Sequence, residues 1–197
     1  MSFRIEYKLF IKKENIYQFK NYLFRKNTKR IFKTRNVESL YFDNKNKDMY
    51  NDSIEGLTPR KKIRIRYYPK STSKYLNIEK KISSVEGRFK ISKKIDNDEF
   101  EKIKSRGIYD NQYGWCYPSI FVTYKREYLK LDDARITIDN SIHYKRFNNS
   151  LTKEDKDIIV EIKSNFLDQL EKIKKKFPFQ NIRFSKYCNG IAKFFSV

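Results

Sequence analysis

The sequence has few of the residues that cross-link a chain, interrupt it or catalyse. Among 197 residues it contains two Cys, four Pro, five Gly, one His and one Trp. Cys116 and Cys188 cannot build a disulfide framework or a CxxC metal site, so a reducing cytosol is the expected compartment. Because there is also no repeat and no Pro-, Gly- or Ser-rich linker, the sequence predicts one domain over residues 1–197.

Long apolar stretches are lacking as well. No run of about 18 apolar residues occurs, which argues against a transmembrane helix. The opening residues, Met1 to Glu6, have no apolar region of the kind that a signal peptide carries. We therefore expect a cytoplasmic protein, and we leave open its oligomeric state and whether a membrane protein is a partner.

Acidic residues are scarce beside basic ones. The chain has 45 Lys and Arg against 24 Asp and Glu, a net charge of +21. Such an excess makes a polyanion the first partner to consider, whether nucleic acid, an anionic membrane or polyphosphate. Since 39% of the residues are hydrophobic and 16% are aromatic, the chain is not a disordered basic tail and can form a core.

Period-two alternation is the most frequent pattern along the chain. Residues 3–9 alternate apolar and charged side chains, which predicts a strand with one apolar face. Similar patterns predict strands at 37–42, 61–68, 75–82, 88–95, 120–130, 134–139 and 157–163. Helical spacing predicts helices at 14–26, 97–106, 165–177 and 185–195, the last interrupted by Gly190. Short links between strands favour an antiparallel sheet or closed barrel with peripheral helices, an α+β fold.

The polar faces of these strands are rich in cations. Arg64 lies with Arg66 on one predicted face, and Arg88 lies with Lys90 on another. On a single strand such a face is most often simply solvated. However, two cations about 6.5 Å apart repel by about 2.5 kcal/mol at an effective dielectric of about 20. A phosphate chain between the rows would relieve this repulsion, because Arg binds phosphate oxygens bidentately.

A few carboxylates share the cationic faces, namely Glu6, Glu79, Asp139 and Glu161. Phosphate would repel them unless they hold a divalent cation, and Mg²⁺ or Mn²⁺ takes one or two carboxylates plus phosphate oxygens. The chain has no glycine-rich loop that could hold phosphates instead. The pattern thus predicts an inward-facing barrel that binds a phosphate chain and a metal.

A series of motifs then resembles a known family. The motifs are Glu6-Tyr7-Lys8, Tyr41-Phe42-Asp43, Arg64-x-Arg66, Glu79-x-Lys81, the Arg88/Lys90 strand, Tyr124-Lys125-Arg126, Asp133-Ala134-Arg135-Ile136-Thr137-Ile138-Asp139, Glu161-Ile162-Lys163 and Arg183-Phe184-Ser185-Lys186-Tyr187. Their order and spacing resemble the VTC domain, the polyphosphate-polymerase branch of the triphosphate tunnel metalloenzymes (CYTH-like). The resemblance implies an eight-stranded antiparallel β-barrel, a tunnel that binds triphosphate and a divalent metal.

The resemblance also implies an activity and residue roles. In this branch the γ-phosphate of ATP is transferred to a growing polyphosphate chain. Catalytic contacts to phosphate are implied for Lys8, Arg64, Arg66, Lys81, Arg126, Arg135 and Lys186, and further phosphate binding for Arg88, Lys90, Lys163, Arg183 and Ser185. Arg88, Lys93 and Lys94 are alternatives for the role of Lys90. Glu161 is implied as the main ligand of Mn²⁺ or Mg²⁺, assisted by Glu79 or Glu6.

Other functions stay open at this point. With water as the acceptor, the same fold would be a tri- or polyphosphatase. Without turnover, it would be a module that binds polyphosphate or inositol phosphates. A nucleic-acid-binding protein would need exposed aromatics for stacking, whereas Tyr67, Phe89 and Phe121 lie opposite the arginine rows like core residues, so no nucleic acid is expected.

Overall fold

Two compact units make up the chain. The computed structural model describes residues 5–69, 76–165, 167–176 and 182–195, so parts of predicted elements at residues 3, 4, 75, 166 and 177 lie outside it. The first unit comprises Met1–Asn36, Tyr124–Ile142 and Glu154–Phe184. The second unit comprises Val37–Thr123, His143–Lys153 and Ser185–Val197.

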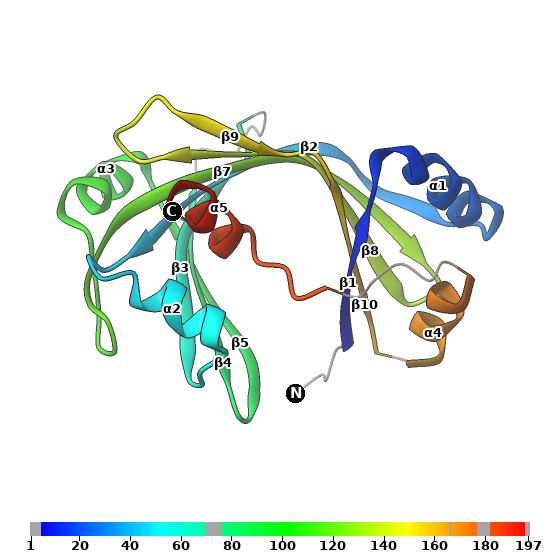
Figure 1. The fold of residues 1–197 in the computed structure, drawn as a ribbon, viewed down its shortest axis with the longest axis horizontal. Coiled ribbons are helices and arrows are strands. Elements are labelled where there is room, and N and C mark those ends of the chain that lie inside the picture. Colours follow the sequence, from blue (N-terminus) through cyan, green and yellow to red (C-terminus); the bar gives the residue numbers. More distant parts are fainter. Residues whose placement is uncertain (1–4, 70–75, 166, 177–181, 196–197) are drawn as a thin grey trace. The chain divides into compact units, whose positions relative to one another are not determined.

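An antiparallel sheet is the framework of the described chain (Figure 1). Its strand order is β1 (Ile5–Ile11), β10 (Ile158–Ser164), β8 (Ala134–Arg146), β7 (Gly114–Leu131), β2 (Lys29–Asp43), β3 (Arg60–Tyr67), β4 (Leu76–Ser84) and β5 (Gly87–Ile95), with β6 (Ile108–Asp110) beside β7 and β9 (Thr152–Asp155) beside β8. The pairs from β2 to β5, and those of β10 with β1 and β8, are antiparallel, as predicted. Within the described residues β1 and β5 end this order, so the sheet is not closed and the barrel stays a prediction.

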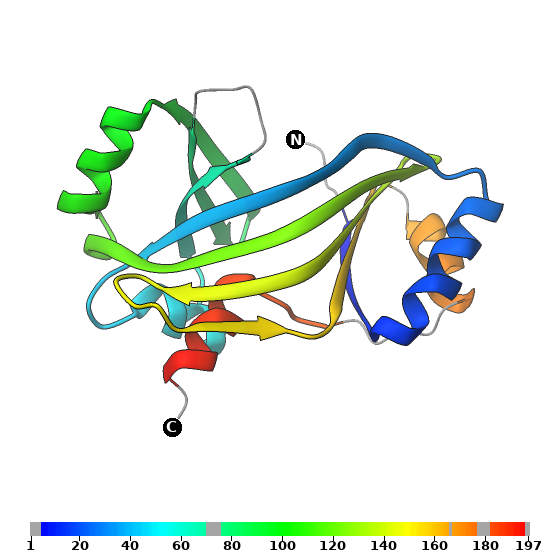
Figure 2. The ribbon, with the colours of Figure 1, turned by 90° about the horizontal axis from the view of Figure 1, so that it is seen from above.

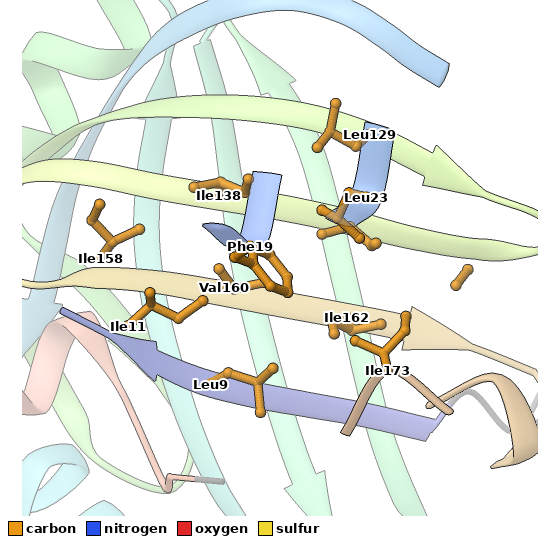
Figure 3. Packing of buried hydrophobic residues seen from close by; sticks show 12 residues of the cluster. Leu9, Ile11, Phe19, Leu23, Leu129, Ile138, Ile158, Val160, Ile162 and Ile173 are labelled. Atoms are coloured by element: carbon orange, nitrogen blue, oxygen red, sulfur yellow. The ribbon is translucent and has the colours of Figure 1, made fainter. Parts of the chain in front are cut away.

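Alternation gives the sheet of the first unit an apolar face that helices cover. Phe19 and Leu23 from one helix and Ile173 from another pack against strand residues such as Leu9 and Val160 (Figure 3). Both helices therefore lie against the same face of the sheet (Figure 2). The helical elements of this unit are η1 (Lys13–Asn15), α1 (Ile16–Arg25) and α4 (Leu167–Lys176).

The second unit follows the same rule. Ile63 and Ile65 of β3 are fully buried, and Phe42 of β2 is buried on the same side. The helices here are α2 (Asp48–Glu55), α3 (Asn97–Arg106) and α5 (Lys186–Phe195). The first of these contacts both β3 and α5. No helix in the described part of the chain is long and apolar enough to cross a membrane.

The structure differs from the sequence-based expectation in several elements. The pattern did not predict α2, β6 or β9. It also missed the first half of β2, because residues 29–35 are all exposed and so need no apolar alternation. Phe89 was expected in the core, yet 38% of its surface is exposed, because it lies on β5 at the end of the strand order.

Gly190 does not interrupt the last helix, contrary to prediction. Residues 186–195 are continuously helical, and the glycine allows close packing instead. A Cβ at this position would lie 2.5 Å from Cδ1 of Ile120 and 2.6 Å from Cδ1 of Tyr144. Both neighbours are fully buried, so they have little room to move. Because Gly190 has no side chain, α5 can pack closely against Ile120 and Tyr144 in the second unit.

We expect Gly190→Ala to lower the free energy of unfolding by up to about 2 kcal/mol, measured by urea denaturation. Helix propensity alone predicts a gain of about 1 kcal/mol, whereas overpacking costs about 1–3 kcal/mol. Adding Ile120→Val should recover part of the loss, because it removes the methyl group that clashes. A Gly190→Ala variant more stable than the wild type would contradict this packing.

Candidate functional site

The polar face of the first unit carries charges on three adjacent strands. The register places Glu6 opposite Lys163 and Lys8 opposite Glu161. Lys163 in turn lies opposite Arg135 of β8. Since residues that face each other across strands point to the same side of a sheet, these side chains share one surface, opposite the apolar cluster.

Lys163 joins the two glutamates of this surface. Its Nζ lies 3.1 Å from Oε2 of Glu6 and 2.7 Å from Oε1 of Glu161. Lys8 Nζ lies 3.3 Å from Oε1 of Glu6 and donates a hydrogen bond of 2.9 Å to the carbonyl of Phe184. Two carboxylates and two ammonium groups thus form one network, which we call the Glu6–Glu161 cluster.

These ion pairs keep both glutamates ionised. Burial acts to raise the pKa of Glu161, but Lys163, Arg126 and Lys8 outweigh it and hold that pKa well below its ordinary value. Burial and the charge of Glu161 also act to raise the pKa of Glu6, and the lysines still lower it. Two carboxylates that could act as metal ligands therefore lie side by side.

Arg126 is held by a neighbouring carboxylate. Its Nε and Nη2 donate hydrogen bonds of 2.6 Å each to the two oxygens of Asp139, which is fully buried. This bidentate geometry is the one that Arg would use for a phosphate. In the structure the guanidinium that sequence reasoning assigned to phosphate is thus oriented by an aspartate.

The polar face of β3, β4 and β5 in the second unit is strongly cationic. By register and alternation, the charged residues that share it are one carboxylate, Glu79, and eight cations, Arg60, Lys62, Arg64, Arg66, Lys81, Arg88, Lys90 and Lys94. Like charges even lie directly opposite one another, as with Lys81 and Lys90. Such a surface attracts anions strongly.

Glu79 neutralises part of this face. Arg64 donates to its Oε2 from Nε at 2.7 Å and from Nη2 at 2.5 Å, and Lys90 Nζ lies 2.5 Å from its Oε1. The third arm of Arg64, Nη1, donates to the hydroxyl of Tyr41 over 2.9 Å. Although burial acts to raise the pKa of Glu79, Arg64, Arg66 and Lys90 lower it to about 2.

A buried aspartate of β2, Asp43, binds both α2 and α5. Asp43 accepts hydrogen bonds from the backbone N–H groups of Met49 and Tyr50 at the start of α2, and from the hydroxyl of Tyr187 in α5. Tyr187 stacks on Tyr41, with ring centroids 5.2 Å apart. Burial raises the pKa of Asp43, only partly offset by these hydrogen bonds. Tyr187 of α5 thereby links Asp43 to Tyr41, the residue that accepts from Arg64.

Sequence reasoning quoted Asp43 within a motif but did not find this role. The residue that precedes α2 is Lys47, in a left-handed conformation and without a capping side chain, so the usual cap position gives no signal. The carboxylate that caps the helix comes instead from a strand end several residues upstream. At α5 the cap is local, since Ser185 Oγ accepts from the N–H of Cys188 at 3.3 Å.

The structure distributes the predicted site residues between the two units. The first unit contains Glu6, Lys8, Arg126, Arg135, Glu161, Lys163 and Arg183. The second contains Arg64, Arg66, Glu79, Lys81, Arg88, Lys90, Ser185 and Lys186. The chemical contacts described above bring together Glu6, Lys8, Glu161 and Lys163 in one, and Arg64, Glu79 and Lys90 in the other. Arg66 Nε instead lies 3.3 Å from the hydroxyl of Ser39.

The carboxylates differ in how well they suit a metal. No group of three or more His, Cys, Asp or Glu side chains that could hold an ion occurs among the described residues. Glu6 and Glu161 form an adjacent anionic pair, and two carboxylates fit Mg²⁺ or Mn²⁺ when phosphate oxygens supply further ligands. Glu79 fits less well, because within the described strands it is the one carboxylate on its face and has no second carboxylate beside it. Ion pairs do not separate the two sites, since both oxygens of Glu79 and both oxygens of Glu6 are paired with cations.

Comparison with known proteins identifies a family and a fold. A family model described as the VTC domain matches residues 3–195, whereas no curated protein matches the chain. A "putative adenylate cyclase" from Bacillus halodurans superimposes with a TM-score of 0.64 at 14% identity, over 99% of this chain and 100% of that one. Another so described, from Vibrio parahaemolyticus, has a TM-score of 0.56 at 11% identity, over 95% and 98%. At these identities the likeness shows the fold alone.

We expect the pH dependence of stability to report on Glu79. Its pKa is lower in the folded chain, about 2, than its ordinary value of 4.5, so its contribution is complete above pH 4.5 and is lost as pH falls towards 2. Thermal denaturation between pH 7 and 2 should therefore show a shallower decline for Glu79→Gln than for the wild type. Glu86→Gln, at an exposed turn, should keep the wild-type decline. Parallel curves for all three proteins would contradict the ion pairs.

Asp43 and Tyr187 should contribute unequally to stability. Tyr187→Phe removes one buried hydrogen bond and keeps the ring stack, so we expect a loss of about 1–3 kcal/mol in urea denaturation. Asp43→Ala also leaves the N–H groups of α2 without their acceptor and should cost clearly more. Tyr109→Phe, at an exposed ring, is the control and should be neutral. Equal losses at positions 43 and 187 would show that the cap contributes nothing.

Proposed function

We propose, because this chain belongs to the VTC domain family, that it is a metal-dependent polyphosphate polymerase that transfers the γ-phosphate of ATP to a growing polyphosphate chain. The observation that carries the proposal is the polar face of β3–β5, where eight cations surround one carboxylate. A chain of phosphates neutralises such a face along its length, whereas a small monoanion would leave most of the repulsion in place.

The chemistry of phosphoryl transfer suits these residues. The reaction needs positioning and charge neutralisation more than a covalent nucleophile. The acceptor, a terminal phosphate oxygen, is already ionised at neutral pH, so no general base is required. Arg64 is oriented by Glu79 and Tyr41 before any ligand arrives, which reduces the ordering needed on binding. Lys81 and Lys90, at the more exposed end of the face, extend the cationic row.

We assign metal binding to the Glu6–Glu161 cluster. Both carboxylates are ionised, and Lys163 and Lys8 beside them can bind phosphate oxygens. A divalent cation held there would withdraw charge from the phosphate oxygens during transfer. The lysines also balance the two glutamates, so this part of the chain stays neutralised without a bound ion. The closed tunnel, the single domain and the cytoplasmic location stay predictions.

Neighbouring lysines of β4 provide a matched test of the phosphate face. Lys81 lies on the cationic face, whereas Lys80 points to the other side and pairs with Asp110 at 3.2 Å. We expect Lys81→Met to weaken triphosphate binding about tenfold in calorimetry, because it removes a charge-assisted contact. Lys80→Met should bind as the wild type does. Equal effects of the two substitutions would overturn the assignment of the face.

Incubation with ATP and Mn²⁺, followed by electrophoresis of the products, tests the activity itself. We expect long polyphosphate from the wild type, and none from Glu161→Gln, which should still bind triphosphate. Glu99→Gln, in an exposed ion pair with Lys93, is the control and should retain activity. Release of orthophosphate alone would show a phosphatase, and binding without any product would show a binding module. Either result would overturn the polymerase.

A further inference from the structure

A second basic region lies in the first unit, outside the Glu6–Glu161 cluster. Between Glu14 and Glu38 the sequence contains no Asp or Glu. The same stretch carries seven cations, Lys20, Arg25, Lys26, Lys29, Arg30, Lys33 and Arg35. It forms α1 and the first half of β2, and residues 29–35 are all exposed. We call residues 16–35 the basic segment.

The basic segment also gathers exposed apolar side chains. Tyr17 is 72% exposed, Phe24 46%, Phe32 45% and Ile31 37%. Among the described residues of the first unit, these are all of the large hydrophobic side chains that are exposed; the others lie in the second unit. This grouping of exposed apolar side chains within one acid-free basic stretch makes the segment a candidate interaction surface.

The packing of α1 explains why two of these rings point outward. Phe19 and Leu23 face the sheet in the hydrophobic cluster (Figure 3). Tyr17 and Phe24 are seven residues apart, about two turns, so they share the opposite side of the helix. Arg25 follows directly and is also exposed. The outward side of α1 thus presents aromatic rings next to positive charge.

We propose that the basic segment binds the surface of an anionic membrane. Tyr and Phe side chains partition into the region of the lipid headgroups, and neighbouring Lys and Arg are attracted to anionic lipids. The chemistry recognised is therefore a lipid surface with net negative charge. This inference does not depend on the phosphoryl-transfer proposal, because it uses none of the residues assigned to it.

The local geometry favours lipid over nucleic acid. Stacking on bases requires open ring faces. The guanidinium carbon of Arg35 lies 4.6 Å from the ring centroid of Phe32, over its face, and the ring of Tyr128 meets Phe32 edge-on at 5.5 Å. Ile31 beside it has no ring to stack. An aliphatic side chain and a guanidinium-covered ring suit an apolar interface with charged headgroups.

Vesicle flotation with the full chain tests the proposal. We expect wild-type protein to float with vesicles of phosphatidylcholine containing 30% phosphatidylglycerol, and not with pure phosphatidylcholine. Tyr17→Ser combined with Phe24→Ser should weaken the partitioning roughly tenfold. Lys29→Gln combined with Arg30→Gln should weaken it about 25-fold, since each cation near the surface contributes about fivefold.

Matched controls come from the second unit. Tyr109→Ser combined with Trp115→Ser removes two exposed rings, and Lys102→Gln combined with Arg106→Gln removes two exposed cations of α3. Both should float as the wild type does, and circular dichroism checks that all variants fold. If the Lys102/Arg106 variant loses as much binding as the Lys29/Arg30 variant, the attraction is only net charge and the proposal fails. If the Tyr109/Trp115 variant loses as much as the Tyr17/Phe24 variant, binding is not specific to the rings of the basic segment and the proposal fails as well. Failure to float, with tight binding to an oligonucleotide that depends on Tyr17 and Phe24, would also overturn it.

Discussion

A strand that exposes charge on one face must bury its other face, and the rest of the structure depends on this constraint. In the first unit α1 and α4 supply the cover, so Leu9 and Val160 are buried while their strand neighbours Lys8 and Glu161 carry charge on the other face. The same alternation buries Ile63 and Ile65 on either side of Arg64. The charged surfaces are therefore as precisely ordered as the cores beneath them, because one backbone register sets both.

The two charged surfaces differ in how the repulsion between like charges is offset. In the Glu6–Glu161 cluster carboxylates and lysines alternate across the strands, so the charges balance locally. On β3–β5 one glutamate serves many cations, and its proton affinity falls accordingly. A balanced surface can accept a cation or an anion with little change in field, whereas an unbalanced one gains most from an anion.

Much of this organisation could be predicted from the sequence. Alternation identified the antiparallel strands and placed Arg64 with Arg66 on one face. The register adds that Glu79 of the next strand shares this face. Sequence spacing was insufficient where a partner is distant along the chain. The pairing of Arg126 with Asp139 and the capping of α2 by Asp43 both depend on which strand or helix end lies nearby. Gly190 was misjudged for a similar reason, since its helix is kept by neighbours from other strands rather than by local propensity.

The position of Asp43 has a consequence for how the second unit opens. One carboxylate holds the first turn of α2 and a side chain of α5, two elements more than 130 residues apart in sequence, as the numbers of Met49 and Tyr187 show. If either helix detached, the buried carboxylate of Asp43 would lose hydrogen bonds that it accepts from that helix. In native-state hydrogen exchange the amides of α2 and α5 would then share one opening free energy, as a single cooperative unit. A motion that detaches the start of α5 at Lys186 would therefore also destabilise α2, through Asp43.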